Sequence, residues 1–323
     1  MGSPAYGHVP VMAARITELL TPALSRPGAV LVDATLGRGG HARALLDACP
    51  QLTLIGIDAD PAAIESGSAL ATDFPGRVRL ARAFYDDIAA VVADEGYAVI
   101  QGVLFDLGVS SPQLDDPDRG FAYARDAPLD MRMDPTAELT AARVLNEYPV
   151  AGLARVLREY GEEKFATRIA EAVARERARE PLTTTSRLAG IVKDAIPAPA
   201  RRTGGNPAKR TFQALRIEVN DELGRLSRAL PAALDLLEVG GRFAALAYHS
   251  LEDRLVKRAL TARTADSTPR RLPVREPVTE FRLLTRGAER PGAEETSVNP
   301  RAASARLRAA ERTSHSQNQP GGR

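Results

Sequence analysis

Residues 29–58 read AVLVDATLGRGGHARALLDACPQLTLIGID, and their pattern decides the fold. A short apolar run at 29–33 is followed by a glycine-rich turn at 37–40, a helical pattern at 42–49 and a second apolar run at 52–57. Strand, glycine loop, helix and strand in this order are typical of the opening of a doubly wound parallel sheet. We therefore predict an α/β fold that begins at the first of these runs.

An acidic residue stands at the end of each of three predicted strands. Asp33 and Asp58 end the two runs quoted above, and Asp106 ends a third run at 99–105. Ligands of open α/β sheets bind outside the carboxyl ends of the strands, so we expect these three carboxylates to face a ligand. The other elements predicted here are a strand at 78–83 and helices at 61–71 and 88–94.

The strand and helix rhythm stops after Asp106. The next convincing strand is 242–248, preceded by a helical pattern at 219–237 and a Gly240-Gly241 turn. A crossover between parallel strands usually needs little more than one helix, so this gap indicates an insertion. A late strand is predicted at 303–309.

Composition excludes several classes of protein. The chain has 43 basic and 41 acidic residues, a net charge of +2, and 44% hydrophobic residues, which is typical of a globular protein rather than a polycationic or an acidic tail protein. A single cysteine, Cys49, cannot form an internal disulfide, and no cysteine and histidine cluster has metal spacing. No apolar run reaches the roughly 18 residues of a membrane span, and residues 1–10 do not resemble a signal peptide, so we expect a cytoplasmic protein without metal.

The near-neutral total hides one strongly basic segment. Residues 201–216 contain no acidic residue, which gives the segment a local charge of +5. Basic side chains bind the phosphates of nucleic acids, although a solvated surface is the simpler interpretation. The residues concerned are Arg201, Arg202, Lys209, Arg210 and Arg216.

The glycine-rich turn fits two nucleotide cofactors. Gly37, Gly39 and Ala42 match the G-x-G-x-x-G/A pattern of dinucleotide enzymes, and Asp58 lies 19 residues past Gly39, near the spacing of a ribose-binding acid. S-adenosylmethionine uses a similar loop and acid, but it is a sulfonium with an ammonium group and has no pyrophosphate. Three carboxylates along one edge would attract that cation and repel a pyrophosphate, which favours the methyl donor.

Long motifs carry a resemblance to a known family. The strings are HVPV at 8–11, DLGVSSPQLDD at 106–116, RGF at 119–121, PLDMRMD at 128–134, RTFQALRI at 210–217, VN at 219–220, HSLEDR at 249–254 and NPR at 299–301. With the glycine loop, they resemble the bacterial 16S ribosomal RNA (cytosine-N4) methyltransferase family, also called the MraW or small subunit methyltransferase H family. The chain departs from it mildly at Leu36, Ala122 and Tyr248, where phenylalanine, serine and phenylalanine are common.

The resemblance implies a class I, Rossmann-like methyltransferase core interrupted by a mainly helical substrate-recognition domain. We therefore expect the core at 1–112 and 219–312, the inserted domain at 113–218 and a disordered tail at 313–323. The family positions that bind S-adenosyl-L-methionine match Gly39, Gly40, His41, Asp58, Phe84, Asp106 and Gln113, with Phe84 against the adenine. We add Asp33 to this set because it ends the strand before the glycine loop.

The resemblance also implies the substrate, a cytosine at position 1402 in the decoding centre of 16S ribosomal RNA, methylated on its exocyclic amine. In-line transfer from a sulfonium depends mainly on positioning. The amine needs a hydrogen-bond acceptor, because its lone pair is delocalised into the ring. The loop from Asp106 to Ser110 and the side chain of Asn220 are candidates, and His249 could meet the base, which must be unpaired or flipped.

Two other functions remain open from the sequence. One is an NAD-dependent oxidoreductase that uses the same glycine loop, and the other is a non-catalytic RNA-binding assembly factor. For the methyltransferase we expect 16S ribosomal RNA within the small subunit or its assembly intermediate as partner, no membrane, and a monomer or homodimer.

Overall fold

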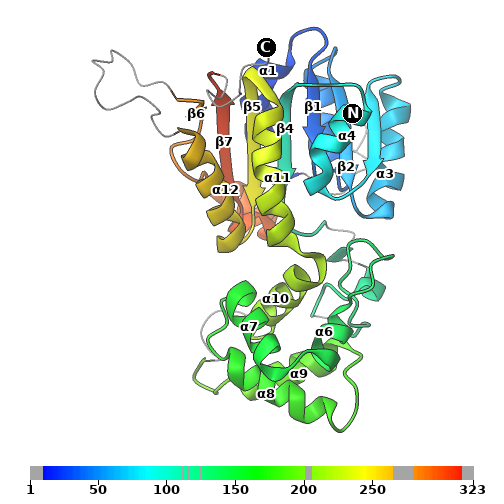
Figure 1. Ribbon diagram of the computed structural model, residues 1–323, viewed down its shortest axis with the longest axis vertical. Helices are drawn as coiled ribbons and strands as arrows, with labels where there is room; N and C mark the ends of the chain where they lie inside the picture. The colour runs from blue at the N-terminus through cyan, green and yellow to red at the C-terminus, as the bar shows by residue number, and fades with distance from the viewer. Residues whose placement is uncertain are drawn as a thin grey trace, which may run out of the picture. The chain divides into compact units, whose positions relative to one another are not determined.

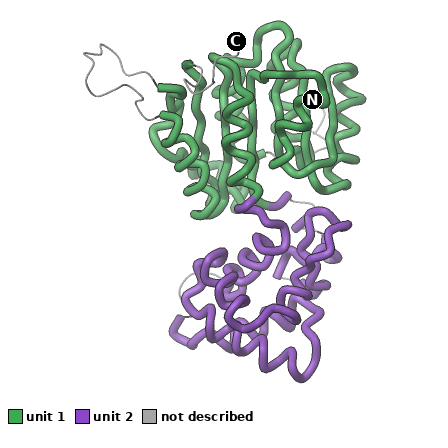
Figure 2. The backbone as a smooth tube through the Cα atoms, viewed as in Figure 1, with its two compact units in different colours: residues 1–108, 225–323 green, residues 109–224 purple. Residues whose placement is uncertain are grey.

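The computed structural model describes residues 10–110, 113–114, 116–123, 125–200, 206–264 and 279–314. The chain forms two compact units, which Figure 2 shows in two colours. Unit 1 comprises Met1–Gly108 and Arg225–Arg323, and unit 2 comprises Val109–Gly224. The insertion was expected at 113–218, which lies within unit 2.

Unit 1 is built on one seven-stranded sheet with the order β3-β2-β1-β4-β5-β7-β6. Strands β1 to β5 are parallel to one another, whereas β7 pairs antiparallel with both β5 and β6. The bounds are β1 Val30–Asp33, β2 Thr53–Asp58, β3 Val78–Arg82, β4 Ile100–Asp106, β5 Leu237–Ala247, β6 Phe281–Leu283 and β7 Arg306–Arg312.

Helices cover both faces of this sheet (Figure 1). Alternate residues of each central strand point to opposite faces: Phe105 packs with residues of α4, α11 and α12, and its neighbour Leu104 packs with residues of α1 and α2. The predicted α/β fold is thereby confirmed. The helices are α1 Ala13–Leu24, α2 Gly40–Ala48, α3 Pro61–Asp73, α4 Ile88–Asp94, α11 Glu222–Leu236, α12 Ser250–Thr264 and α13 Ala293–Val298, with 3₁₀ turns η1 Tyr85–Asp87 and η4 Pro300–Ser304.

Several elements differ from their predictions. The late strand expected at 303–309 is β7, which begins at Arg306 because the 3₁₀ turn η4 extends to Ser304. The single helix expected at 219–237 is wrong, because α10 ends at Asn220 and Asp221 adopts a left-handed φ of 49° before α11 begins. Strand β5 begins at Leu237 rather than at 242, since the Gly240-Gly241 turn lies in an irregularity where Ile100 pairs with Leu237 and Gly102 with Arg242. Helix α1 and strand β6 were not predicted.

Unit 2 is mainly helical. Its core is formed by apolar side chains of α6 to α10 together with Phe121, Leu129 and Met131 of the preceding loop. The described elements are η2 Pro117–Arg119, α6 Ala141–Glu147, α7 Val150–Gly161, α8 Ala166–Arg177, α9 Thr185–Ala195 and α10 Lys209–Asn220.

Two further expectations concern the ends of the chain and membranes. In the segment expected to be a tail, the Thr313 backbone N–H donates to the Glu280 carbonyl at 2.9 Å, and residues 315–323 lie outside the described residues. No helix in the described part of the chain is long and apolar enough to cross a bilayer.

Candidate functional site

The three strand-end carboxylates lie along one edge of the unit 1 sheet. Asp33, Asp58 and Asp106 are the last residues of β1, β2 and β4. The parallel register pairs Asp33 with Gly56 on one side and with Leu104 on the other, so the three strands end at nearly the same level. The structure therefore brings together the acids that the sequence predicted.

Burial makes this edge unfavourable for negative charge. It raises the pKa of Asp33 to about 7, and the charges of Asp106 and Asp58 add to that rise while His41 opposes it. Burial also raises the pKa of Asp58 to about 6, against the hydrogen bonds from the Asp60 and Gly37 backbone. Among the described residues, neither aspartate forms an ion pair with a lysine or an arginine. A cationic ligand would fit this edge.

The glycine loop is hydrogen-bonded to Asp58, the acidic residue that ends β2. The Gly37 backbone N–H donates to Asp58 Oδ2 at 2.8 Å, and both Gly37 and Gly39 have left-handed φ values, 53° and 71°. A Cβ atom on Gly39 would lie 2.3 Å from Leu70 Cδ1, and one on Gly40 would lie 2.5 Å from Pro10 Cγ. The glycines are therefore required by backbone conformation and packing, and they hold the start of α2 beside Asp58.

Asp106 lies between a histidine and a tyrosine. His41 Nε2, on α2, is 3.5 Å from Asp106 Oδ2, and the Tyr248 hydroxyl donates to Asp106 Oδ1 at 2.8 Å. The Asp106 backbone N–H donates to the Thr35 hydroxyl. His41 is only 6% exposed, and neither of its ring nitrogens has a hydrogen-bond partner within the described residues. A buried imidazole of this kind is expected to meet a ligand.

Phe84 is half-buried just beyond β3, and one face of its ring is covered. The Arg225 guanidinium carbon lies 3.5 Å from the ring centroid, and Arg225 and Arg228 both bond to Asp86 at 2.9 Å. Burial alone would raise the pKa of Asp86, but the hydrogen bonds from both arginines hold that pKa below its ordinary value. An adenine ring can therefore use only the opposite face of Phe84.

His249 is held by a helix-capping glutamate. Its Nε2 lies 3.0 Å from Glu252 Oε1, and Glu252 Oε2 accepts the backbone N–H groups of Tyr248 and His249 at 2.8 and 3.3 Å. Glu252 is 3% exposed and so caps the start of α12 from within. Neither ring nitrogen of His249 forms a hydrogen bond within the described residues, as for His41, so the expected encounter of His249 with the target base stays a prediction.

Ser110 and Gln113, in unit 2, bond to each other. The Ser110 backbone N–H donates to Gln113 Oε1 at 2.9 Å, and the Gln113 backbone N–H donates to the Ser110 hydroxyl at 3.5 Å. Gln113 is 6% exposed. The pair fixes the turn that follows the Asp106 strand in the chain.

Asn220 holds a loop by both ends of its amide. Its Oδ1 accepts the Met133 backbone N–H at 2.7 Å, and its Nδ2 donates to the carbonyls of Met131 and Arg216 at 2.8 Å each. The side chain is 6% exposed. Backbone groups therefore bind both ends of the Asn220 amide. These bonds explain why an asparagine lies here without any contact to a target amine.

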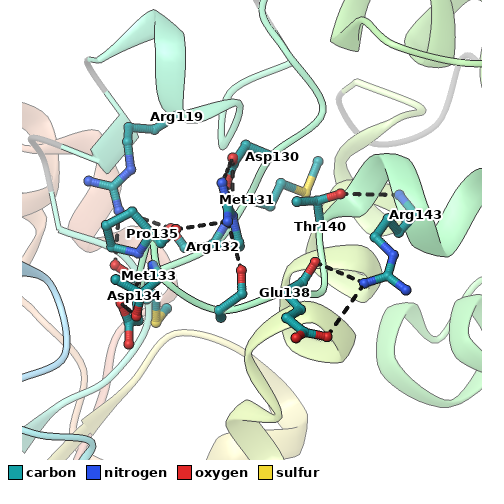
Figure 3. Close-up of polar contacts among 12 residues, drawn as sticks. Arg119, Asp130, Met131, Arg132, Met133, Asp134, Pro135, Glu138, Thr140 and Arg143 are labelled. Atoms are coloured by element: carbon teal, nitrogen blue, oxygen red, sulfur yellow. Dashed lines mark hydrogen bonds and ion pairs between the residues drawn. The ribbon is translucent and has the colours of Figure 1, made fainter.

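The same loop is fastened by two arginines (Figure 3). Arg119 donates to the carbonyls of Arg132 and Met133 at 2.9 and 3.1 Å, and Arg132 donates to the carbonyls of Pro135 and Ala137 at 2.8 and 2.7 Å. Arg132 also forms an ion pair with Asp130. The motifs at 119–121 and 128–134 thus serve to rigidify an irregular segment.

The basic segment divides into exposed and paired residues. Lys209 and Arg210 are exposed at the start of α10. Arg216, in contrast, forms a two-fold hydrogen-bonded ion pair with Glu222 at 2.7 and 2.8 Å, with side chains only 14% and 6% exposed. Its expected role as a phosphate contact is replaced by this ion pair. Arg201 and Arg202 lie outside the described residues.

Several contacts of this site have no local signal in the sequence. Thr35, Tyr248 and Arg225 were not assigned a role, and their partners are 71 to 142 residues away in the chain. Only the observation that strands β4 and β5 are neighbours could have placed Tyr248 beside Asp106.

Comparisons with known proteins agree with the motifs. Residues 5–313 match the model of the MraW methylase family. The chain is 64% identical over 309 residues to ribosomal RNA small subunit methyltransferase H of Frankia alni, covering 95% of each chain, and 60% identical over 316 residues to that of Thermobifida fusca, covering 97% of this chain and 95% of the relative. A putative rRNA-methylase structure from Clostridium thermocellum aligns over 96% of this chain and 99% of its own, with 12% identity and a TM-score of 0.44.

The family model and the curated relatives confirm the resemblance inferred from the motifs and the expected cofactor, S-adenosyl-L-methionine. The seven-stranded sheet with the order β3-β2-β1-β4-β5-β7-β6 confirms the expected Rossmann-like class I fold. Neither alternative, the oxidoreductase or the non-catalytic factor, is favoured. The chain belongs to the MraW methylase family, whose members are S-adenosylmethionine-dependent methyltransferases.

Proposed function

We propose that this methyltransferase methylates the exocyclic N4 of a cytosine, position 1402 of the decoding centre, in 16S ribosomal RNA of the small subunit or its assembly intermediate. The relatives are named ribosomal RNA small subunit methyltransferase H, which supports an RNA substrate. The observation that carries the proposal is the sheet edge of Asp33, Asp58 and Asp106 beside the orphaned imidazole of His41. We place the reaction in the cytoplasm.

The residues of unit 1 fit the donor by charge. The bound donor supplies an electrophilic methyl group on a sulfonium. Asp33 and Asp106 offset its positive groups, Asp58 accepts hydrogen bonds from the ribose hydroxyls, and the open face of Phe84 receives the adenine. Gly39, Gly40 and His41 border this edge from the loop and the start of α2. We also propose that Gln113 contacts the cofactor, because it matches a cofactor-binding position of the family that the sequence resembles.

The chain's contribution to transfer is positioning. The amine of the target base needs an acceptor that turns its lone pair toward the methyl group, and Asp106, with the loop that ends at Ser110, is our candidate. We do not retain Asn220, because loop backbone engages both ends of its amide. His249 remains a candidate for contact with the base, because neither of its ring nitrogens has a hydrogen-bond partner among the described residues. Phosphates of the RNA are proposed to contact the exposed Lys209 and Arg210.

A pyrophosphate cofactor fits this edge poorly. A dinucleotide would place two negative charges beside Asp33 and Asp58, whose own ionisation is already disfavoured by burial. This repulsion argues against the oxidoreductase.

The test is a methyl-transfer assay on small subunits from a strain that lacks the protein, with free 16S RNA alongside. Nucleoside mass spectrometry should detect N4-methylcytidine after incubation with the wild-type chain. Asp106→Ala should reduce the rate at least about 100-fold, since an aligned polar contact in a water-excluded site has an effect of this order. Asp94→Ala, an exposed acid at the end of α4, is the control and should act as wild type. The proposal is wrong if the wild-type chain forms no N4-methylcytidine on either substrate.

A further inference from the structure

Tyr248 is placed beside Asp106 by the pairing of two strands. Strand β5 runs parallel to β4 with Asp106 opposite Leu246, and the Leu107 backbone N–H donates to the Leu246 carbonyl at 3.0 Å. Tyr248 follows β5 directly. Its hydroxyl donates to Asp106 Oδ1 at 2.8 Å, although the two residues are 142 positions apart in the chain.

The tyrosine has little freedom to move. Its backbone N–H donates to Glu252 Oε2 at 2.8 Å, and Glu252 is itself buried. The ring lies against Gly108, where a Cβ atom would come within 3.4 Å of Tyr248 Cδ2 and where φ is 98°. A larger residue at 108 would be strained and would crowd the ring. The hydroxyl therefore reaches Asp106 from a fixed backbone and a fixed ring.

The hydroxyl is a permanent donor. Burial, the charge of Asp106 and the hydrogen bond to it raise the pKa of Tyr248 far above its ordinary value, so the group stays protonated throughout the neutral range. A neutral donor on Oδ1 leaves Oδ2 of Asp106 directed toward His41 Nε2, 3.5 Å away. Without that donor, the carboxylate would lose the contact that sets its rotation.

We propose that Tyr248 is a positioning residue of the methyl-transfer site, whose hydroxyl orients the Asp106 carboxylate so that Oδ2 faces the bound donor. The role rests on the proposed place of Asp106 in the cofactor site. Tyr248 touches neither donor nor base in this role and acts only through Asp106.

The experiment removes the hydroxyl alone. Tyr248→Phe keeps the ring and the backbone N–H that donates to Glu252, so the fold should survive. Calorimetric titration with S-adenosylhomocysteine should show about tenfold weaker binding, the effect expected for one hydrogen bond to a charged acceptor. The matched control is Tyr148→Phe, which removes a tyrosine to carboxylate bond of 2.9 Å, to Glu218 in unit 2, and should leave the affinity unchanged.

A double-mutant cycle separates positioning from a general structural effect. In an Asp106→Ala background, adding Tyr248→Phe should change the affinity less than about twofold, because the acceptor is already gone. Unchanged binding by Tyr248→Phe, or a tenfold loss that persists in the Asp106→Ala background, would overturn the role. If the wild-type chain bound no S-adenosylhomocysteine, the cofactor site itself would be wrong.

Discussion

The acidic residues at the sheet edge of unit 1 and those of the helical unit 2 differ in whether an arginine pairs with them. At the edge, Asp33 and Asp58 form no ion pair with a lysine or an arginine among the described residues, and burial raises the pKa of both. In unit 2, burial alone would raise the pKa of Asp130, but hydrogen bonds from Arg132 hold it below its ordinary value, and Glu222 is paired with Arg216. Paired acids stabilise the fold, whereas the unpaired ones are available to a cationic ligand.

The largest effect is expected where this pairing is broken in unit 2. Arg216→Met removes the arginine that is paired with the buried Glu222 carboxylate, which should lower the free energy of unfolding by about 4 kcal/mol. Urea unfolding followed by circular dichroism measures the change. Arg143→Met is the control, because its pair with Glu147 is exposed and should contribute under about 0.5 kcal/mol. Equal losses in the two variants would show that the buried pair has no special role.

A second prediction concerns Asp33, which lies at the sheet edge without an arginine or lysine partner in the described part of the chain. Because the folded pKa of Asp33 lies above its ordinary value of 3.8, at about 7, the folded protein retains a proton that the unfolded chain releases. Stability without cofactor is therefore lost as pH rises from about 4 to about 7. Asp33→Asn cannot ionise and should gain about 2 kcal/mol at pH 8, and less at pH 5.

Thermal unfolding of the cofactor-free protein at the two pH values checks this. The same variant should bind S-adenosylmethionine more weakly, since a negative charge has been removed. Asp94→Asn, exposed at the end of α4, should show neither effect. A gain that is the same at pH 5 and pH 8 would contradict the assignment of the effect to ionisation of Asp33.

The smallest effect is expected at Arg225, which is paired but also covers Phe84. Arg225→Met keeps an apolar cover and removes the cation, which should weaken S-adenosylmethionine binding about fivefold, within the range of a partly buried cation to aromatic contact. Arg43→Met is matched to it, because Arg43 lies over Phe74 at 5.4 Å and pairs with Asp73. If both variants bind as wild type, the covered face of Phe84 does not influence the cofactor.

The sequence predicts those features of the fold that depend on residues close together in the chain. Strands β1, β2 and β4 are buried parallel strands, which read as continuous apolar runs, and their terminal acids were visible as such. The end of α10 at Asp221 was not visible in the sequence, because a left-handed φ at a residue other than glycine leaves no local signal. Helix α1 contains Pro22 and has no capping side chain, so its start was not marked either.

For the site, residue type does not reveal the partner. Asn220 and Arg216 were reasonable candidates, yet the Met133 backbone engages the first and Glu222 pairs with the second. The acids at the strand ends were predictable because topology alone places them, whereas these two residues depended on contacts that no spacing rule describes.

The most direct test of the central claim, that the carboxylates at the sheet edge bind a cationic cofactor, is calorimetric titration of the full chain with S-adenosylmethionine and, separately, with NAD. We predict saturable binding of S-adenosylmethionine that Asp58→Ala and Asp106→Ala each weaken, and no binding of NAD. Binding of NAD without binding of S-adenosylmethionine would contradict the account.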